Sequence, residues 1–279
     1  MSIWPWNPNR IVRDVKAFST NSGVVRVETD LGEGYLKALG NKSGPHSLAC
    51  ELVGTLLAEW LGLRTLQYGL IEVTTDFQSE LGNGVLAEVG PAFITRAEEG
   101  HDWSGNARDL EFVDNPNDVA LFVVFDTWTR NCDRYQPREN RAPRQNLGNV
   151  FLSHEGAQAG RFILKPIDHG CCFTCDRELS PRNLASQSDD RVYGLFPGFC
   201  SFARRDTALR AVSRLESIVR ADIERIVDAV PPQWDVSAAT RSIWCDWIYT
   251  QSRRVRQIIE RELTPIDLVD GLSDWEERP

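Results

Sequence analysis

No apolar stretch of this sequence approaches the roughly 20 residues that a helix needs to span a membrane. Residues 1–6 also lack the charged start and the apolar middle of a signal peptide. Positive charge is scarce, because 31 Lys and Arg face 40 Asp and Glu and give a net charge of −9. A surface of that sign does not favour nucleic acid. We therefore expect a cytoplasmic protein that by itself binds neither membrane nor nucleic acid.

The cysteines do not form the pattern of a disulfide framework or of a zinc site. There are seven, an odd number, which indicates reduced thiols in the cytoplasm. Cys171, Cys172 and Cys175 lie close together, but zinc needs four ligands and Cys200 and Cys245 stand alone. We expect buried free thiols in this segment, and oxidative control of it is the alternative.

What the sequence does contain is enough apolar material for a core. Its 279 residues are 42% hydrophobic and 25% charged, which is typical of one large or two modest globular domains. Residues 10–39 alternate apolar and polar positions and are interrupted by turn-rich segments at 19–23 and 30–34. This pattern predicts an antiparallel meander of strands. Residues 67–73 and 90–96 predict further strands.

Lys37 lies inside the third predicted strand. A lysine there either faces solvent on an edge strand or contacts the α and β phosphates of a nucleotide. The next element favours a nucleotide, because a predicted helix over residues 48–62 places Glu51 beside its apolar stripe, where a carboxylate is costly unless paired. A strand lysine followed by an early helix glutamate is the lysine–glutamate pair of kinases. Glu51 could instead be an acid favoured by the helix dipole, with Glu59 as the weaker alternative partner.

Acidic and amide residues lie at the ends of two short apolar runs in the middle of the chain. Asp133 precedes the first run, Asn149 opens it, and Asp168 follows the second. A helix over residues 119–128, apolar on every face, is predicted to be buried and to deliver Asp133 to a cleft. Phosphoryl transfer needs one carboxylate to orient the attacking hydroxyl, and an amide and a second carboxylate to hold Mg²⁺. A turn aspartate would explain Asp168 alone, but not its combination with Asp133 and Lys37.

The order of these residues is that of the catalytic and metal loops of protein kinases, although no His-Arg-Asp triplet is present. The motifs are Phe125-Asp126-x-Trp128-x-x-Asn131-x-Asp133-Arg134 and Ile167-Asp168-His169-Gly170. They resemble the HipA-like kinase family, in particular its compact bacterial branch without the extra N-terminal domain. The resemblance implies an α+β, two-lobed protein-kinase-like fold related to phosphatidylinositol kinases. Its N-lobe would be an antiparallel sheet and its C-lobe mainly helical.

The loop after Asp133 departs from the family pattern Asp-Arg-x-x-x-Asn. Arg138 occupies the amide position, and an insertion rich in arginine and proline follows. The metal amide is then Asn149, Asn146 or Asn140, and Asn149 is preferred because an apolar strand follows it directly. We expect the insertion to be a solvated surface loop, and binding of an acidic or phosphorylated substrate through its arginines is the alternative.

Two charged residues of the first motif are predicted to be structural. Arg134 is expected to anchor the catalytic loop through carboxylate or carbonyl contacts, and Asp126 to cap or pair locally. Tyr135 stands where many relatives carry histidine.

Two segments are expected to contact the nucleotide beside Lys37. The turn over residues 19–23 has the small, hydroxyl-bearing composition of a flap over phosphates, which makes Ser22 and Gly23 candidate contacts. A plain hairpin turn is the alternative. The family's Gly-Pro-x-Phe segment leads into a hinge whose backbone binds adenine, and the matching hinge residues here are Arg96, Ala97 and Glu98.

An N-lobe over residues 1–97 and a C-lobe over residues 98–279 are thus expected to enclose ATP and Mg²⁺. Asp133 would orient a Ser or Thr hydroxyl on a protein, Asn149 and Asp168 would hold the metal, and Lys37, positioned by Glu51, would grip the phosphates. The alternatives are a nucleotide-binding pseudokinase acting as an interaction module, and a small-molecule or lipid kinase. The acceptor and any partner or antitoxin protein are not identified by the sequence.

Overall fold

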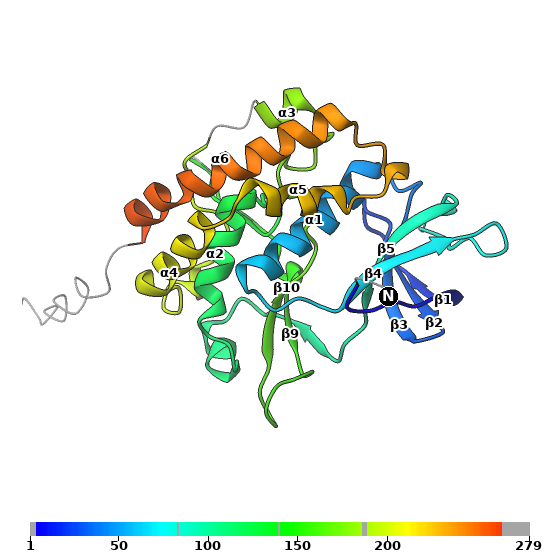
Figure 1. Ribbon diagram of the computed structural model, residues 1–279. Coiled ribbons are helices and arrows are strands. Elements are labelled where there is room, and N and C mark those ends of the chain that lie inside the picture. The colour runs from blue at the N-terminus through cyan, green and yellow to red at the C-terminus, as the bar shows by residue number, and fades with distance from the viewer. Residues whose placement is uncertain (1–3, 83, 139, 186–188, 264–279) are drawn as a thin grey trace, which may run out of the picture.

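The computed structural model describes residues 4–82, 84–138, 140–185 and 189–263. The outer ends of the two expected lobes, residues 1–3 and 264–279, lie outside the described residues. The chain forms two lobes, one built on a five-stranded sheet and the other mainly on helices (Figure 1). This is the α+β architecture that the sequence predicts.

The N-lobe sheet is antiparallel throughout and has the order β1-β2-β3-β5-β4. Its strands are β1 (Ile11–Ala17), β2 (Val25–Thr29), β3 (Gly32–Lys37), β4 (Tyr68–Val73) and β5 (Gly90–Arg96). Strand β2 alternates buried and half-buried residues, as its apolar alternation predicts. The meander is therefore confirmed, and it ends with Lys37 opposite Phe93 in the centre of the sheet.

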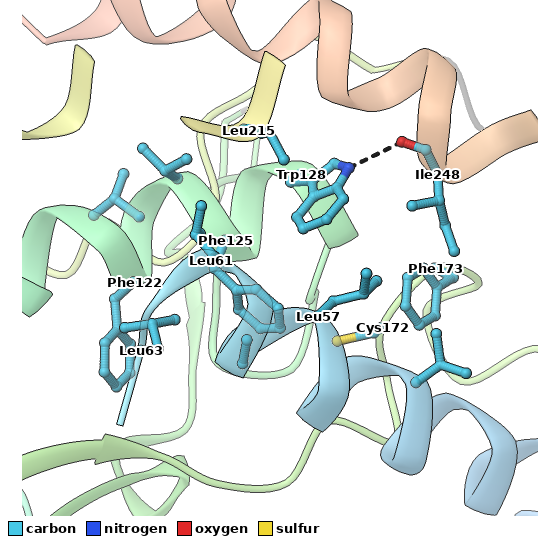
Figure 2. Close-up of a cluster of buried hydrophobic side chains, with 14 of the residues drawn as sticks. Leu57, Leu61, Leu63, Phe122, Phe125, Trp128, Cys172, Phe173, Leu215 and Ile248 are labelled. Atoms are coloured by element: carbon cyan, nitrogen blue, oxygen red, sulfur yellow. Dashed lines mark hydrogen bonds between the residues drawn. The ribbon is translucent and has the colours of Figure 1, made fainter. Parts of the chain in front are cut away.

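Helix α1 (Pro45–Leu61) connects the two lobes through its packing. It begins after Gly44, carries proline in its first turn, and ends at Gly62, whose φ of +104° suits glycine. Its apolar side chains belong to the same buried cluster as the C-lobe helices. Figure 2 shows Leu57 and Leu61 of α1 beside Phe125 and Trp128.

The C-lobe is built around a largely buried helix, α2 (Asp118–Thr129). Its other helices are α3 (Pro181–Ala185), α4 (Arg205–Glu216), α5 (Arg220–Asp228) and α6 (Ala238–Glu262). Helix α2 is buried on nearly every side, as its composition predicts. The indole Nε1 of Trp128 donates to the carbonyl of Ile248 on α6 at 3.0 Å, which joins the two helices (Figure 2). Among the described residues, no helix has the length and apolar character needed to cross a bilayer.

Short 3₁₀ turns complete the C-lobe between its longer elements. They cover Ala107–Phe112, Leu147–Asn149, Pro197–Phe199 and Pro232–Trp234. The second of these turns ends at Asn149, which places this amide directly before a strand, as predicted.

Small strands line the junction between the lobes. Strands β6 (Gly100–Asp102), β9 (Val150–Ser153) and β10 (Ile163–Pro166) form a sheet of order β10-β9-β6. Strands β9 and β10 were predicted, whereas β6 was not, because it is three residues long and fully exposed.

The insertion after Asp133 is exposed at residues 138 and 140–145, as the prediction of a solvated surface loop requires. It folds back as a two-stranded ribbon of β7 (Tyr135–Gln136) and β8 (Arg144–Gln145). Strands of two residues carry no periodicity that a sequence could show. The backbone N–H of Asn146 also donates to the carbonyl of Arg134 at 2.8 Å, which closes the ribbon onto the catalytic loop.

Candidate active site

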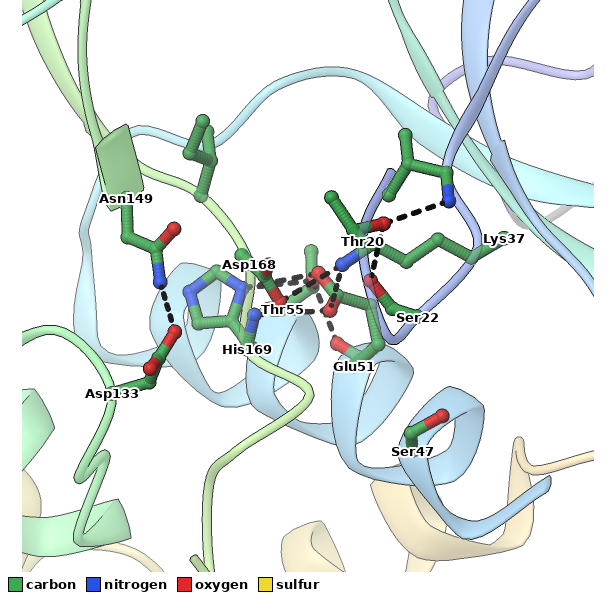
Figure 3. A network of polar contacts seen from close by, with 12 residues as sticks. Thr20, Ser22, Lys37, Ser47, Glu51, Thr55, Asp133, Asn149, Asp168 and His169 are labelled. Atoms are coloured by element: carbon green, nitrogen blue, oxygen red, sulfur yellow. Dashed lines mark hydrogen bonds and ion pairs between the residues drawn. The ribbon is translucent and has the colours of Figure 1, made fainter. Parts of the chain in front are cut away.

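Lys37 lies at the centre of a buried ion cluster (Figure 3). Its Nζ is 2.7 Å from Oε2 of Glu51 on α1 and 2.9 Å from Oδ1 of Asp168, which follows β10. The side chain of Lys37 is 12% exposed and that of Glu51 is 4% exposed. The sequence predicts the pair with Glu51, and the pair is present. Glu59, the alternative partner, instead accepts a hydrogen bond from the Tyr68 hydroxyl at 2.6 Å.

Lys37 and Glu51 hold each other in the ionised form. Burial alone would lower the pKa of Lys37, but Asp168 and Glu51 outweigh it and raise that pKa above its ordinary value. Burial alone would raise the pKa of Glu51, but Lys37 and a hydrogen bond from His169 lower it below the usual range. The site therefore presents a fixed cation between two fixed anions.

Asp168 adopts a backbone conformation that is uncommon for a residue with a side chain. Its φ is +58°, within the left-handed region. The next residue, His169, donates its backbone N–H to Oε2 of Glu51 at 3.0 Å, and its Nδ1 lies 3.4 Å from the Thr55 hydroxyl. Helix α1 thus fixes both Lys37, through Glu51, and the loop that carries Asp168.

Gly54 of α1 allows this close approach, which yields a testable prediction. A Cβ at position 54 would lie 2.6 Å from Cβ of His169. Alanine favours a helix over glycine by roughly 1 kcal/mol, so Gly54→Ala should not unfold α1. It should displace the loop of Asp168 and lower the rate of the phosphotransfer that the sequence predicts by up to about 100-fold. Steady-state kinetics and far-UV circular dichroism test this, and an unchanged rate would contradict it.

Asp133 is held by three donors. Its Oδ2 accepts from the side-chain amides of Asn149 at 2.9 Å and Asn146 at 3.1 Å, and its Oδ1 pairs with the guanidinium of Arg144. Figure 3 shows the bond between Asn149 and Asp133. The third candidate amide, Asn140, lies exposed in the ribbon. The structure thus brings Asn149 and Asn146 to Asp133 and keeps Asn140 away.

Arg134 joins the catalytic loop to the loop of Asp168. It is fully buried and pairs with Asp126 of α2. It also donates to the carbonyls of Asn149 at 3.1 Å and Ile167 at 2.9 Å. Burial raises the pKa of Asp126, against the opposing charge of Arg134. These contacts are the carboxylate and carbonyl contacts that the sequence predicts for Arg134 and Asp126.

Tyr135, which stands where many relatives carry histidine, supports the loop in another way. It belongs to β7, and its ring packs against Phe196, with centroids 5.2 Å apart. Its carbonyl accepts from the N–H of Gly194 at 3.0 Å.

A cleft of about 400 Å³ opens beside the ion cluster of Lys37. Lys37, Glu51, Asn149 and Asp168 line it. Its apolar wall comes from both lobes and consists of Phe18, Val24, Tyr35, Leu66, Phe93, Phe151, Pro166 and Ile167. Such a wall suits a flat aromatic ring. Sequence analysis did not find these residues, because nothing separates them from ordinary core side chains.

The predicted flap meets the cleft through Thr20 and not through Ser22 or Gly23. Thr20 lines the cleft, and the hydroxyl of Ser22 lies 3.5 Å from that of Thr20. Gly23 has a φ of +61°, and its backbone N–H donates to the carbonyl of Thr20 at 3.2 Å. Ser22 and Gly23 therefore shape the turn behind the residue that faces the cleft.

The three predicted hinge residues differ in their contacts. The backbone N–H groups of Arg96 and Ala97 donate to the carbonyls of Gln67 at 2.8 Å and Glu33 at 2.9 Å, so these two donors are engaged within the N-lobe. Glu98 lines the cleft. Its carboxylate lies 2.6 Å from Nζ of Lys165 on β10, which ties the connection between the lobes to the C-lobe.

A family model for the HipA-like kinases matches residues 28–262 of the chain. The chain belongs to the HipA-like kinase family. Among solved structures, it is similar to the Helicobacter pylori proinflammatory kinase CtkA, with a TM-score of 0.55 and 13% sequence identity. The match covers 94% of this chain and 98% of that one, so it extends over both lobes of the fold. No curated protein sequence matches the chain.

A second ion cluster, centred on Asp189, holds a segment that follows the loop of Asp168. Asp189 pairs with Arg130 at 3.2 Å and with Nε of Arg191 at 2.8 Å, and it accepts from the Tyr193 hydroxyl at 2.8 Å. Arg130 lies three residues before Asp133, at the end of α2. The cluster therefore connects the segment to the catalytic loop. Sequence analysis missed it because its members carry no motif.

The Asp189 cluster should make the stability of the kinase sensitive to acid. Burial would raise the pKa of Asp189, but Arg191, Tyr193 and Arg130 outweigh it and lower that pKa. The contribution of Asp189 to the free energy of unfolding is therefore fully present above the ordinary aspartate pKa of about 3.9. It is lost as the pH falls through the lower pKa of the folded state.

We expect Asp189→Asn to cost about 2 kcal/mol of unfolding free energy at neutral pH, because hydrogen bonds to a charged group are lost. The difference from the wild type should shrink in acid. Urea unfolding at neutral and acid pH measures it, with the exposed Asp190→Asn as the neighbouring control. A difference that does not change with pH would contradict the assignment.

The cysteines are free and unequally buried. Cys50, Cys132, Cys172 and Cys245 are buried, Cys171 and Cys175 are partly exposed, and Cys200 is exposed. Burial raises the pKa of the Cys172 thiol well above its usual value. The three thiols at 171, 172 and 175 are free, as predicted, and Cys172 is also buried, whereas Cys171 and Cys175 are only partly so.

Proposed function

We propose that this HipA-like kinase transfers the γ-phosphoryl group of ATP, with Mg²⁺, to a Ser or Thr hydroxyl of a protein. The observation that carries the proposal is the position of Lys37 between Glu51 and Asp168 at the edge of the cleft. A lysine held in this way meets phosphate oxygens as a preorganised cation, while Asp168 stands where a metal would bridge the phosphates.

The residues present fit a magnesium ion. Mg²⁺ is usually bound through one or two carboxylates together with phosphates and water. Asp168 offers a carboxylate that is 35% exposed. Asn149 uses its amide N–H for Asp133, which leaves its amide oxygen as a ligand. Among the described residues, no group of three His, Cys, Asp or Glu side chains could hold a metal, so the proposed site relies on these two ligands and on the nucleotide.

Each remaining residue has a defined task in the proposal. Mg²⁺ supplies charge neutralisation at the phosphates when it is bound. Asp133 accepts a hydrogen bond from the acceptor hydroxyl and orients its oxygen toward the γ-phosphorus. Glu51 keeps Lys37 in place, and the apolar wall excludes water around the base. A loose transition state needs orientation from Asp133 more than basicity.

One observation favours a second candidate, a nucleotide-binding pseudokinase that acts as an interaction module. The carboxylate of Asp133 is already engaged by Arg144, Asn146 and Asn149, so an acceptor hydroxyl must displace or join these donors. Nucleotide binding without transfer to any acceptor would support this candidate.

Transfer from radiolabelled ATP distinguishes the two candidates. Purified protein should transfer label to itself or to added proteins only with Mg²⁺, and Asp133→Ala should remove this transfer without weakening nucleotide binding. Phosphoproteomics after expression of the wild type, compared with Asp133→Ala, should then show the acceptors. Label found on lipids or metabolites alone would reject a protein acceptor. Nucleotide binding without any transfer would reject the kinase.

A further inference from the structure

The ribbon after Asp133 returns one arginine to the catalytic loop. Tyr135 pairs with Gln145, and Gln136 pairs with Arg144. The two strands therefore place Arg144 against Asp133, although they are eleven residues apart in the chain. This contact comes from the segment that interrupts the family pattern of the loop.

Arg144 is positioned to act on a ligand as well as on Asp133. Its side chain is 48% exposed, whereas that of Asp133 is 14% exposed. One terminal nitrogen of the guanidinium engages Oδ1 of Asp133. Within the described part of the chain, no second partner of the guanidinium is present. A guanidinium has five N–H donors in a rigid plane, so most of them face open space.

Three cations near the cleft and the loop of Asp133 are bound by protein anions. Lys37 is shared by Glu51 and Asp168, and Lys165 is bound by Glu98. Arg134 is fully buried against Asp126. Arg144 is thus the cation beside Asp133 that retains donors for a phosphate.

Distance supports the same assignment. An acceptor oxygen hydrogen-bonded to Asp133 lies roughly 3 Å from the carboxylate, and the attacked phosphorus lies roughly 3 Å beyond that oxygen. A guanidinium anchored on the same carboxylate can reach the equatorial oxygens of that phosphoryl group without a change of fold. These oxygens share the negative charge during transfer, and an arginine supplied from the same chain stabilises such charge in other phosphotransferases.

We propose that Arg144 is a catalytic residue that bridges Asp133 and the transferring γ-phosphoryl group. In the step, the bond between the γ-phosphorus and the β–γ bridging oxygen breaks, and a bond between that phosphorus and the acceptor oxygen forms. The hydroxyl proton passes to Asp133 and then to solvent, and ADP leaves. Arg144 stays protonated throughout, because its pKa is too high for it to lose a proton. This assignment rests on the proposed phosphotransferase function.

Kinetics of Arg144→Ala test the proposal on the full chain. With Mg²⁺-ATP, and release of phosphate to water or autophosphorylation as the readout, kcat should fall by about 100- to 1,000-fold, as for other arginines in this role. KM for ATP should change less than about threefold, since the interaction is made in the transition state. Arg144→Lys should retain part of the rate, and added guanidinium should partly rescue Arg144→Ala.

A binding measurement adds a readout that does not depend on turnover. ADP with aluminium fluoride imitates the planar phosphoryl group, so Arg144→Ala should weaken its binding about 100-fold while ADP alone binds as before. Arg141→Ala, which removes the same charge from the same ribbon, should have a much smaller effect on both measurements.

The outcomes separate this proposal from the proposed function. A faster Arg144→Ala enzyme would make the contact an inhibitory latch, and a rise in KM for an acceptor alone would make Arg144 a binding residue. An equal effect of Arg141→Ala would assign the effect to the charge of the ribbon. Each of these overturns the catalytic role while leaving the kinase intact. A wild type that transfers no phosphate overturns both proposals.

Discussion

Replacing Asp168 by alanine should abolish phosphotransfer while the protein stays folded. The substitution removes the carboxylate proposed to hold Mg²⁺ and one of the two anions on Lys37. A bound metal ion contributes several kcal/mol to the transition state, so we expect a loss of at least about 1,000-fold in kcat. Lys37 keeps Glu51 as its partner at 2.7 Å, and the fold should therefore persist.

Two measurements make this prediction specific. Mg²⁺ should strengthen ATP binding to the wild type but not to Asp168→Ala, which titration calorimetry can show. Glu59→Gln is the control, since Glu59 is an acid of α1 that contacts Tyr68 and lies outside the ion cluster. If Asp168→Ala retains wild-type turnover, or Glu59→Gln loses as much, the assignment of the metal loop is wrong.

Replacing Arg134 by methionine should cause the largest loss of stability. Methionine fills much of the same volume but leaves the carboxyl of Asp126 in the core without its ion-pair partner. Breaking a buried ion pair in this way costs about 3–5 kcal/mol. The carbonyls of Asn149 and Ile167 lose a donor as well, so the catalytic and metal loops should separate and activity should fall with stability.

A double variant distinguishes charge from packing in this result. Arg134→Met combined with Asp126→Leu removes both charges and should recover a large part of the lost unfolding free energy. Activity should not return, because the two carbonyl contacts are still absent. Chemical denaturation of the wild type, both single variants and the double variant measures the coupling. A double variant no more stable than Arg134→Met would show that packing, and not the buried charge, dominates.

The sequence predicted the parts of the site that depend on local order along the chain. Lys37, Glu51 and Asp168 follow strand and helix patterns strong enough to place each residue, and the N-lobe meander and α2 follow from alternation and from all-round apolarity. The family resemblance then assigned a common role to residues that are far apart in sequence.

What the sequence did not predict depends on contacts between distant segments. The strands of the ribbon are too short to show an alternation of apolar and polar residues. The ribbon matters for the site through one tertiary contact, between Arg144 and Asp133. The Asp189 cluster joins residues from α2 and a later irregular segment. The backbone N–H groups of Arg96 and Ala97 donate to the carbonyls of Gln67 and Glu33, which only the tertiary structure shows. In each case local sequence patterns do not show the contact, and only the three-dimensional structure does.

The burial of α1 limits how this kinase can be switched off. Withdrawing the helix to separate Glu51 from Lys37 would bring Leu48, Leu52, Leu57 and Leu61, each at most 1% exposed, into water. Exposure costs roughly 2 kcal/mol for each such side chain. Withdrawing the helix would therefore cost a free energy comparable to the whole stability of an ordinary domain. Displacement of α1 is therefore an energetically costly way to separate Glu51 from Lys37.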